Sequence, residues 1–177
     1  MIEVDPRSPG AVPALVRTVL RPLRPWLAAS GALAGLAAGA SVASGTGLWI
    51  HATAVLLLHL VLGLLGSFVV HELGHVVALR WWAPGVERIR LDASWTRVSI
   101  TPVGVLTSGQ AIASALAGPG LCVLVGTVIA LASPLWGIQV WYLLHAVFVL
   151  PCFGDGRAIL TVLRRSGSAH HSVSPSS

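Results

Sequence analysis

The stretch HELGHVVALRWW, residues 71–82, places three ionisable side chains close together near the end of a long apolar segment. On a helix, residues four apart lie on one face, so His71 and His75 can direct imidazole nitrogens at one Zn²⁺ ion. Glu72 lies beside them and can accept a proton from a water that the zinc has acidified. Hydrogen bonds to neighbouring helices are the alternative role, but ionisable groups in apolar helices are costly and functional by default.

Four apolar stretches are each long enough to cross a hydrocarbon core as a helix of ~20 residues. They cover residues 26–43, 49–80, 109–132 and 138–163. Hydrophobic residues make up 55% of the 177-residue chain and charged residues 10%, whereas about a quarter of a soluble domain is charged. No stretch alternates apolar and polar residues as the strands of a membrane barrel do. The sequence therefore predicts an all-α membrane protein with about four transmembrane helices.

The arginines that flank these stretches all fall on one side of a four-span topology. They precede the first stretch, separate the second from the third and follow the fourth, while the connections 44–48 and 133–137 are uncharged. The positive-inside rule then predicts that both termini are cytoplasmic. We expect a multi-pass protein embedded in the lipid bilayer of a bacterial cytoplasmic membrane. The net charge of +5 does not indicate nucleic-acid binding, because the arginines border apolar spans and form no cluster on a soluble face.

Three regions are predicted along the chain. Residues 1–25 form a basic cytoplasmic segment, residues 26–165 the membrane domain, and residues 166–177 a polar, disordered tail. Alternatively, residues 1–43 are a cleavable signal peptide, because Ser41-Val42-Ala43 resembles a small-residue cleavage site. That alternative leaves the remaining topology unchanged.

The segment between the second and third stretches has the pattern of a short β-hairpin. Pro84-Gly85 is a turn signal after the second stretch. Residues suited to one strand face then alternate on both sides of Asp92-Ala93-Ser94. They are Glu87, Ile89 and Leu91 before this turn, and Thr96, Val98 and Ile100 after it. We predict a membrane-associated hairpin with its turn at residues 92–94.

A catalytic zinc needs a third protein ligand and an open fourth position. Apart from Glu72, Asp155 is the only acidic residue well inside a span. Glu72 precedes Trp81, near the end of its span, by nine residues, and Asp155 precedes Arg164 by the same number. At 1.5 Å per residue, both carboxylates lie about 13 Å from the cytoplasmic ends of their helices. Asp155 is therefore the predicted third ligand, and an ion pair with Arg157 is its alternative role.

Three motifs, in this order, resemble those of the site-2 proteases, a family of intramembrane zinc metalloproteases. They are His71-Glu72-Leu73-Gly74-His75, Ala117-Gly118-Pro119 and Gly154-Asp155-Gly156-Arg157, and the resemblance covers residues 48–163. It implies that His71, His75 and Asp155 bind one Zn²⁺ per chain and that Glu72 is the general base. It also implies that the hairpin at residues 86–104 lines the substrate path, and that residues 26–165 are an intramembrane metalloprotease domain.

The chain departs from the family pattern in its polar residues. Cys122 stands where family members often carry an asparagine, and the chain contains no asparagine at all. Groups that would position the substrate backbone are therefore missing or replaced. No separate regulatory module fits in 177 residues, so we expect regulation by a membrane partner, by prior trimming of the substrate or by its abundance.

The remaining histidines inside the spans are predicted not to reach this metal. His51 and His59 lie about 18 Å or more along the helix from the motif of the second span. His145 lies ten residues before Asp155, and we interpret all three as packing or interfacial residues. Cys152, three residues before Asp155, is an alternative ligand if the helix continues there.

The predicted activity is hydrolysis of a peptide bond in a membrane-embedded protein or peptide by a zinc-activated water. The substrate helix must unwind locally, and the extended segment can pair with the edge of the hairpin. Two other functions stay open. A zinc transporter also carries His/Glu pairs in membrane helices, although the outer halves of these spans offer few polar groups. An inactive scaffold of the same fold is disfavoured by the intact HELGH motif.

Overall fold

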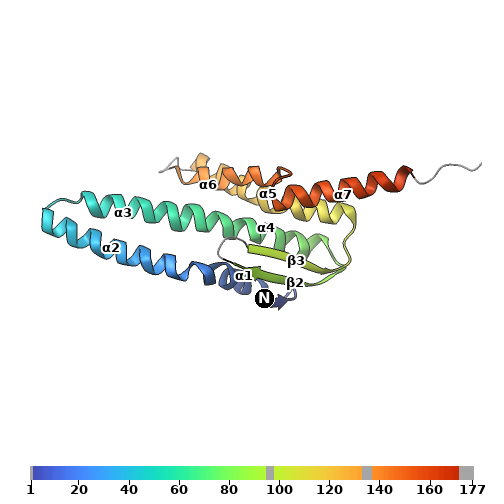
Figure 1. Ribbon diagram of the computed structural model, residues 1–177, viewed down its shortest axis with the longest axis horizontal. Helices are drawn as coiled ribbons and strands as arrows, with labels where there is room; N and C mark the ends of the chain where they lie inside the picture. Colours follow the sequence, from blue (N-terminus) through green and yellow to red (C-terminus); the bar gives the residue numbers. More distant parts are fainter. Residues whose placement is uncertain (1, 95–97, 133–136, 172–177) are drawn as a thin grey trace, which may run out of the picture.

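Apolar sequence and internal hydrogen bonding produce a mostly helical molecule with one small antiparallel sheet (Figure 1). The structure, a computed structural model, describes residues 2–94, 98–132 and 137–171, with side chains as far as Arg165. The elements in chain order are β1 (Ile2–Val4), α1 (Ala11–Leu20), η1 (Arg21–Leu23), α2 (Arg24–Ser44), α3 (Leu48–Leu58), η2 (His59–Leu65), α4 (Gly66–Trp82), β2 (Val86–Ala93), β3 (Val98–Gly104), α5 (Ser108–Ala132), α6 (Gln139–Leu143), η4 (Leu144–Val149) and α7 (Gly154–His171).

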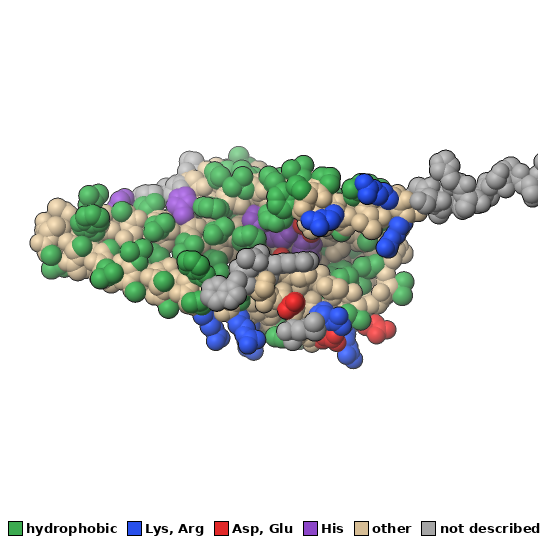
Figure 2. Space-filling view, viewed as in Figure 1, with side chains coloured by type: hydrophobic (Ala, Val, Ile, Leu, Met, Phe, Trp, Pro, Cys, Tyr) green, Lys and Arg blue, Asp and Glu red, His purple; other side chains and the backbone are tan. Residues whose placement is uncertain are grey.

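Four helical segments are long and apolar enough to cross a membrane. They are Ala11–Ser44, Leu48–Trp82, Ser108–Ala132 and Gln139–Arg165, which match the four predicted apolar stretches. The first begins earlier than predicted because α1 and η1 run directly into α2. On the face seen in Figure 2, arginine side chains gather below and at the right, and the left-hand end, where α2 meets α3, shows none.

The N-terminal residues contribute to the core beneath α4, although the sequence analysis assigned no element to residues 1–25. Helix α1 buries Ala11, Leu15 and Val19, which are four residues apart and so share one helical face. This face packs against Val76 and Leu79 of α4 and against β2. Burial of such an apolar face stabilises the fold because it removes hydrocarbon from water or lipid headgroups.

The sheet has the order β1-β2-β3, so the predicted hairpin carries a third strand that was not predicted. Strand β1 pairs through Ile2–Val4 with Ile89–Leu91 of β2. The Glu3 carboxylate accepts hydrogen bonds from Arg90 Nε at 3.1 Å and Nη2 at 2.9 Å. These bonds hold the pKa of Glu3 below its ordinary value, because they favour the charged carboxylate.

The predicted turn at residues 92–94 is wrong in its first two residues. Asp92 and Ala93 pair with Ser99 and Val98, so β2 continues through Ala93. The alternation of inward and outward residues simply extends past Leu91 on this strand, with Asp92 exposed. Thr96, predicted to begin the second strand, lies outside the described residues.

The second and fourth helical segments are irregular where they meet. Residues 59–65 form a π-helix, η2, and its Leu62 carbonyl accepts a hydrogen bond from the Tyr142 hydroxyl at 2.8 Å. In the fourth segment, Leu150 has an extended conformation (φ −67°, ψ 145°), so the helix is interrupted before Pro151. Helix α7 then begins at Gly154 and extends to His171, past residue 165, where the predicted tail begins.

Candidate metal centre

Three potential ligand side chains converge from two helices. His71 and His75 project from α4, and Asp155 lies in the first turn of α7. The two Nε2 atoms are 3.2 Å apart, His71 Nε2 lies 3.1 Å from Asp155 Oδ2, and His75 Nε2 lies 3.4 Å from Asp155 Oδ1. A tetrahedral zinc with bonds of about 2.0–2.1 Å holds its ligand atoms roughly 3.3 Å apart. The three side chains therefore already have the spacing that a tetrahedral metal ion requires.

Hydrogen bonding sets which ring nitrogen of His75 faces this centre with a free lone pair. His75 Nδ1 lies 2.7 Å from the main-chain oxygen of Ser114, which can only accept. We therefore assign the ring proton to Nδ1, which leaves Nε2 as a lone pair directed at His71 Nε2 and Asp155. Acceptors facing one another in a buried site need a cation between them, and the donor set of two imidazoles and one carboxylate suits Zn²⁺.

The position of His75 depends on the close approach of α4 and α5. A Cβ at Gly74 would collide with the carbonyl of Ala117, so glycine at this position in α4 is what lets the two backbones meet. The same approach brings the Ser114 carbonyl within reach of the imidazole. The glycine of HELGH therefore has a packing role, distinct from the metal chemistry of its neighbours.

The interruption of the fourth segment positions Asp155. Gly156 lies against the carbonyls of Val149 and Leu150, where a Cβ would collide with both. The carboxylate of Asp155 therefore sits at the N-terminal end of α7, where the helix dipole favours a negative charge. Arg157 does not neutralise it as the alternative reading required, since its guanidinium donates to the main-chain oxygen of Cys152 at 2.9 Å.

A cavity of about 680 Å³ opens beside the ligands and is bordered by them, by Glu72 and by strand β3. Figure 2 shows histidine side chains in the hollow between the upper helices and the sheet. Glu72 is 7% exposed and accepts no hydrogen bond from any described residue. Its carboxylate is therefore available to a water or substrate in the cavity. From β3 the lining residues are Val98, Ser99, Ile100 and Pro102.

His145 lies at this centre, and the prediction that it is too remote is wrong. Its ring centroid is 5.1 Å from that of His71, and both side chains are 4% exposed. The prediction measured helical rise back from Asp155, but the chain between these two residues is a 3-10 helix followed by an extended residue. Pro151, which breaks the helix, was the signal that could have corrected it.

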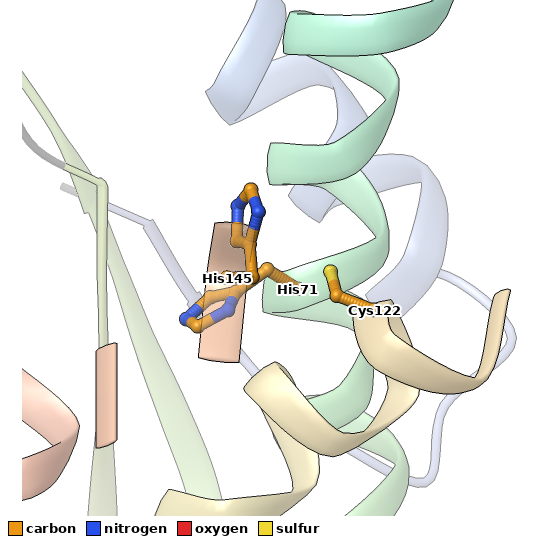
Figure 3. Close-up of side chains that lie close together, drawn as sticks. All are labelled: His71, Cys122 and His145. Atoms are coloured by element: carbon orange, nitrogen blue, oxygen red, sulfur yellow. The ribbon is translucent and has the colours of Figure 1, made fainter. Parts of the chain in front are cut away.

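His145 also belongs to a second group of possible ligands with His71 and Cys122. One ligand atom from each of the three lies within 4.8 Å of the other two. Figure 3 shows these side chains extending from α4, α5 and η4 into the same space. Cys152 borders the cavity but belongs to neither group. His59 packs elsewhere, accepting a hydrogen bond from Trp141 Nε1 at 3.0 Å.

The described residues thus contain a His-His-Asp group, a free carboxylate beside it and a cavity that reaches an edge strand. No family model matches the chain, and comparisons with curated proteins and with solved structures also returned no match.

Proposed function

We propose that this protein is an intramembrane zinc metalloprotease that cleaves a peptide bond in a membrane-embedded substrate. The observation that carries the proposal is the spacing of His71, His75 and Asp155, whose ligand atoms lie 3.1–3.4 Å apart. Glu72 and an apolar cavity large enough for several residues of extended chain lie beside them. The three motifs that resemble those of site-2 proteases support the same reading.

His71, His75 and Asp155 would hold the ion, which when bound supplies a Lewis acid that polarises a carbonyl and acidifies water. The Glu72 carboxylate would accept the proton of the attacking water and return it to the leaving amine. The C–N bond of the peptide breaks as the new C–O bond forms, and the products are a carboxylate and an amine. His75 keeps its orientation throughout because its Nδ1 proton stays on the Ser114 carbonyl.

Strand β3 is suited to hold the unwound substrate. It is an edge strand of the sheet, and its side chains border the cavity. Pro102 has no N–H, so we assign it a ladder position whose backbone points away from β2. Every second residue shares that direction, so the N–H and C=O groups of Val98 and Ile100 would face the open edge. An extended substrate can add there as a further strand.

The proposal is tested by zinc analysis and cleavage together. The protein is purified, reconstituted in lipid vesicles and given a library of tagged single-span peptides. Parent protein should contain about one zinc per chain and cleave at least one library member. Glu72→Gln should keep the zinc and lose cleavage, because an amide cannot take up the proton.

Further variants separate ligand loss from loss of any carboxylate. Asp155→Ala should lose zinc, whereas Asp5→Asn, which changes a carboxylate remote from the cavity, should behave as the parent. A parent without zinc, or a Glu72→Gln variant with parental cleavage, would overturn the proposal. Zinc flux across the vesicle membrane without any cleavage would instead identify a transporter.

A further inference from the structure

Two buried ring nitrogens near the metal centre have no hydrogen-bond partner among the described residues. They are His71 Nδ1 and His145 Nε2. A buried polar group without a partner costs about 1–3 kcal/mol, so each such group calls for a physical account. The two rings are neighbours, with centroids 5.1 Å apart and planes inclined by 47°.

The protons on these rings can be assigned from their other contacts. His145 Nδ1 lies 2.9 Å from the main-chain oxygen of Trp141, which only accepts, so Nδ1 carries the proton and Nε2 is an acceptor. His71 Nε2 faces Asp155 and the metal centre, so it presents a lone pair and the proton sits on Nδ1. The two unpaired nitrogens are therefore one donor and one acceptor.

We propose that His145 is a positioning residue for the metal ligand His71, accepting a hydrogen bond from His71 Nδ1–H. This inference rests on the proposed metal centre. The bond would fix the tautomer and orientation of the His71 ring, so that its Nε2 lone pair points at the metal. Metal-binding histidines generally donate their second ring N–H to such a partner, which also raises the basicity of the ligand nitrogen. The resulting chain of contacts runs from the Trp141 carbonyl through His145 to His71.

Aromatic side chains close this pair off from water. Phe148 stacks on His145 with centroids 5.1 Å apart and planes inclined by 25°, and it lies 5.1 Å from His71 as well. Phe68 meets His145 edge-on at 5.2 Å. A water is a poor substitute for His145 in such surroundings, because it would find few polar partners besides the two rings.

Cys122 offers two competing accounts, since its sulfur lies within 4.8 Å of a nitrogen of each ring. The sulfur could accept the His71 proton, or the three groups could bind a second metal ion. The Cys122 thiol, however, donates to the Ser67 carbonyl at 3.2 Å, and metal binding would require that proton to leave. The contacts of His145 and Cys122 therefore favour the pairing of the two imidazoles.

The test compares zinc affinity in four variants of the full-length protein. His145→Phe removes the acceptor and keeps an aromatic ring, while His145→Gln keeps an acceptor at about the place of Nε2. His59→Phe is the matched control, because His59 also contacts Trp141 from within a membrane segment but lies away from the centre. Cys122→Ala tests the thiol. Zinc dissociation constants come from competition with a chelating dye, and Co²⁺ absorption spectra report the coordination geometry.

We expect His145→Phe to weaken zinc binding about 10- to 100-fold and to alter the Co²⁺ spectrum. His145→Gln should recover most of the affinity, which a general loss of folding would not allow, and the other two variants should match the parent. Parental affinity in His145→Phe would overturn this inference alone, whereas a parent that binds no zinc would overturn the proposed centre with it. A loss in Cys122→Ala without one in His145→Phe would assign the role to the thiol. A second zinc lost from both would identify a second metal site instead.

Discussion

The backbone of Gly118 lies directly against the imidazole of His75. A Cβ at this position would be 2.5 Å from Nε2 and 2.7 Å from Cε1 of the ring. Real Cβ atoms do not approach other heavy atoms so closely, so a larger residue would have to displace the ring or the helix. The glycine of the Ala117-Gly118-Pro119 motif is therefore part of the environment that sets the ligand geometry.

Substituting Gly118→Ala should lower zinc affinity by at least about tenfold, because the methyl group occupies the space of His75 Nε2. Gly120→Ala is the matched control, since a Cβ there meets nothing within 4 Å on the same helix. Zinc titration of both variants against the parent measures the effect. Equal affinities for Gly118→Ala and Gly120→Ala would show that α5 yields readily and does not constrain His75.

Proline substitutions along β3 should have alternating effects. Ile100→Pro removes an N–H that faces the open edge, so cleavage should fall while zinc content is retained. Ile100→Ala controls for the lost side chain. Thr101→Pro removes an N–H on the β2 side, so it should lower stability and zinc content together. Uniform activity across Val98→Pro and Ile100→Pro would rule out strand addition as the mode of substrate binding.

The packing of α1 beneath α4 predicts a large effect of Leu15→Ala on stability. Leu15 is 0% exposed in the core, so its truncation should cost about 2–5 kcal/mol of unfolding free energy. Val12→Ala, at a position 41% exposed on the same helix, should change it by less than about 0.5 kcal/mol. Denaturant unfolding in detergent measures both. Similar values for the two variants would mean that α1 does not belong to the cooperative core.

The arginine distribution predicts that both termini are cytoplasmic and that the α2–α3 connection is outside. A reporter that is active only outside the cytoplasm should be silent after Ser177 and active when inserted at Gly45, an exposed residue with φ of 66°. Activity of the C-terminal fusion would contradict the four-span topology. It would also remove the argument that the carboxylates of Glu72 and Asp155 lie at equal depth.

The metal-ligand geometry was accessible from sequence where it depends on local helix periodicity. His71 and His75 are four residues apart in an uninterrupted helix, so their shared face follows from 3.6 residues per turn. Asp155 was accessible through its depth in a parallel span, and the structure brings its carboxylate within 3.1 Å of His71. Both arguments need only the rise of a helix and the thickness of a bilayer.

The features that were missed depend on breaks in periodicity or on distant pairing. His145 reaches His71 only because the helix ends at Leu150, and uniform helical rise cannot anticipate that. Strand β1 is three residues long and pairs with residues nearly ninety positions away, which leaves no local pattern. The apolar face of α1 was visible as a four-residue spacing, but it was read as a basic flanking segment because of its arginines.

The unequal edges of the sheet have a consequence for selectivity. An incoming extended chain meets seven residues of ladder along β3 but only three along β1 at the opposite side. More main-chain hydrogen bonds are available on the long side, so an unfolded segment would be sorted toward the ligands without any recognition of its side chains. The short side also gives a second copy of the protein little to pair with, which disfavours growth of the sheet from molecule to molecule.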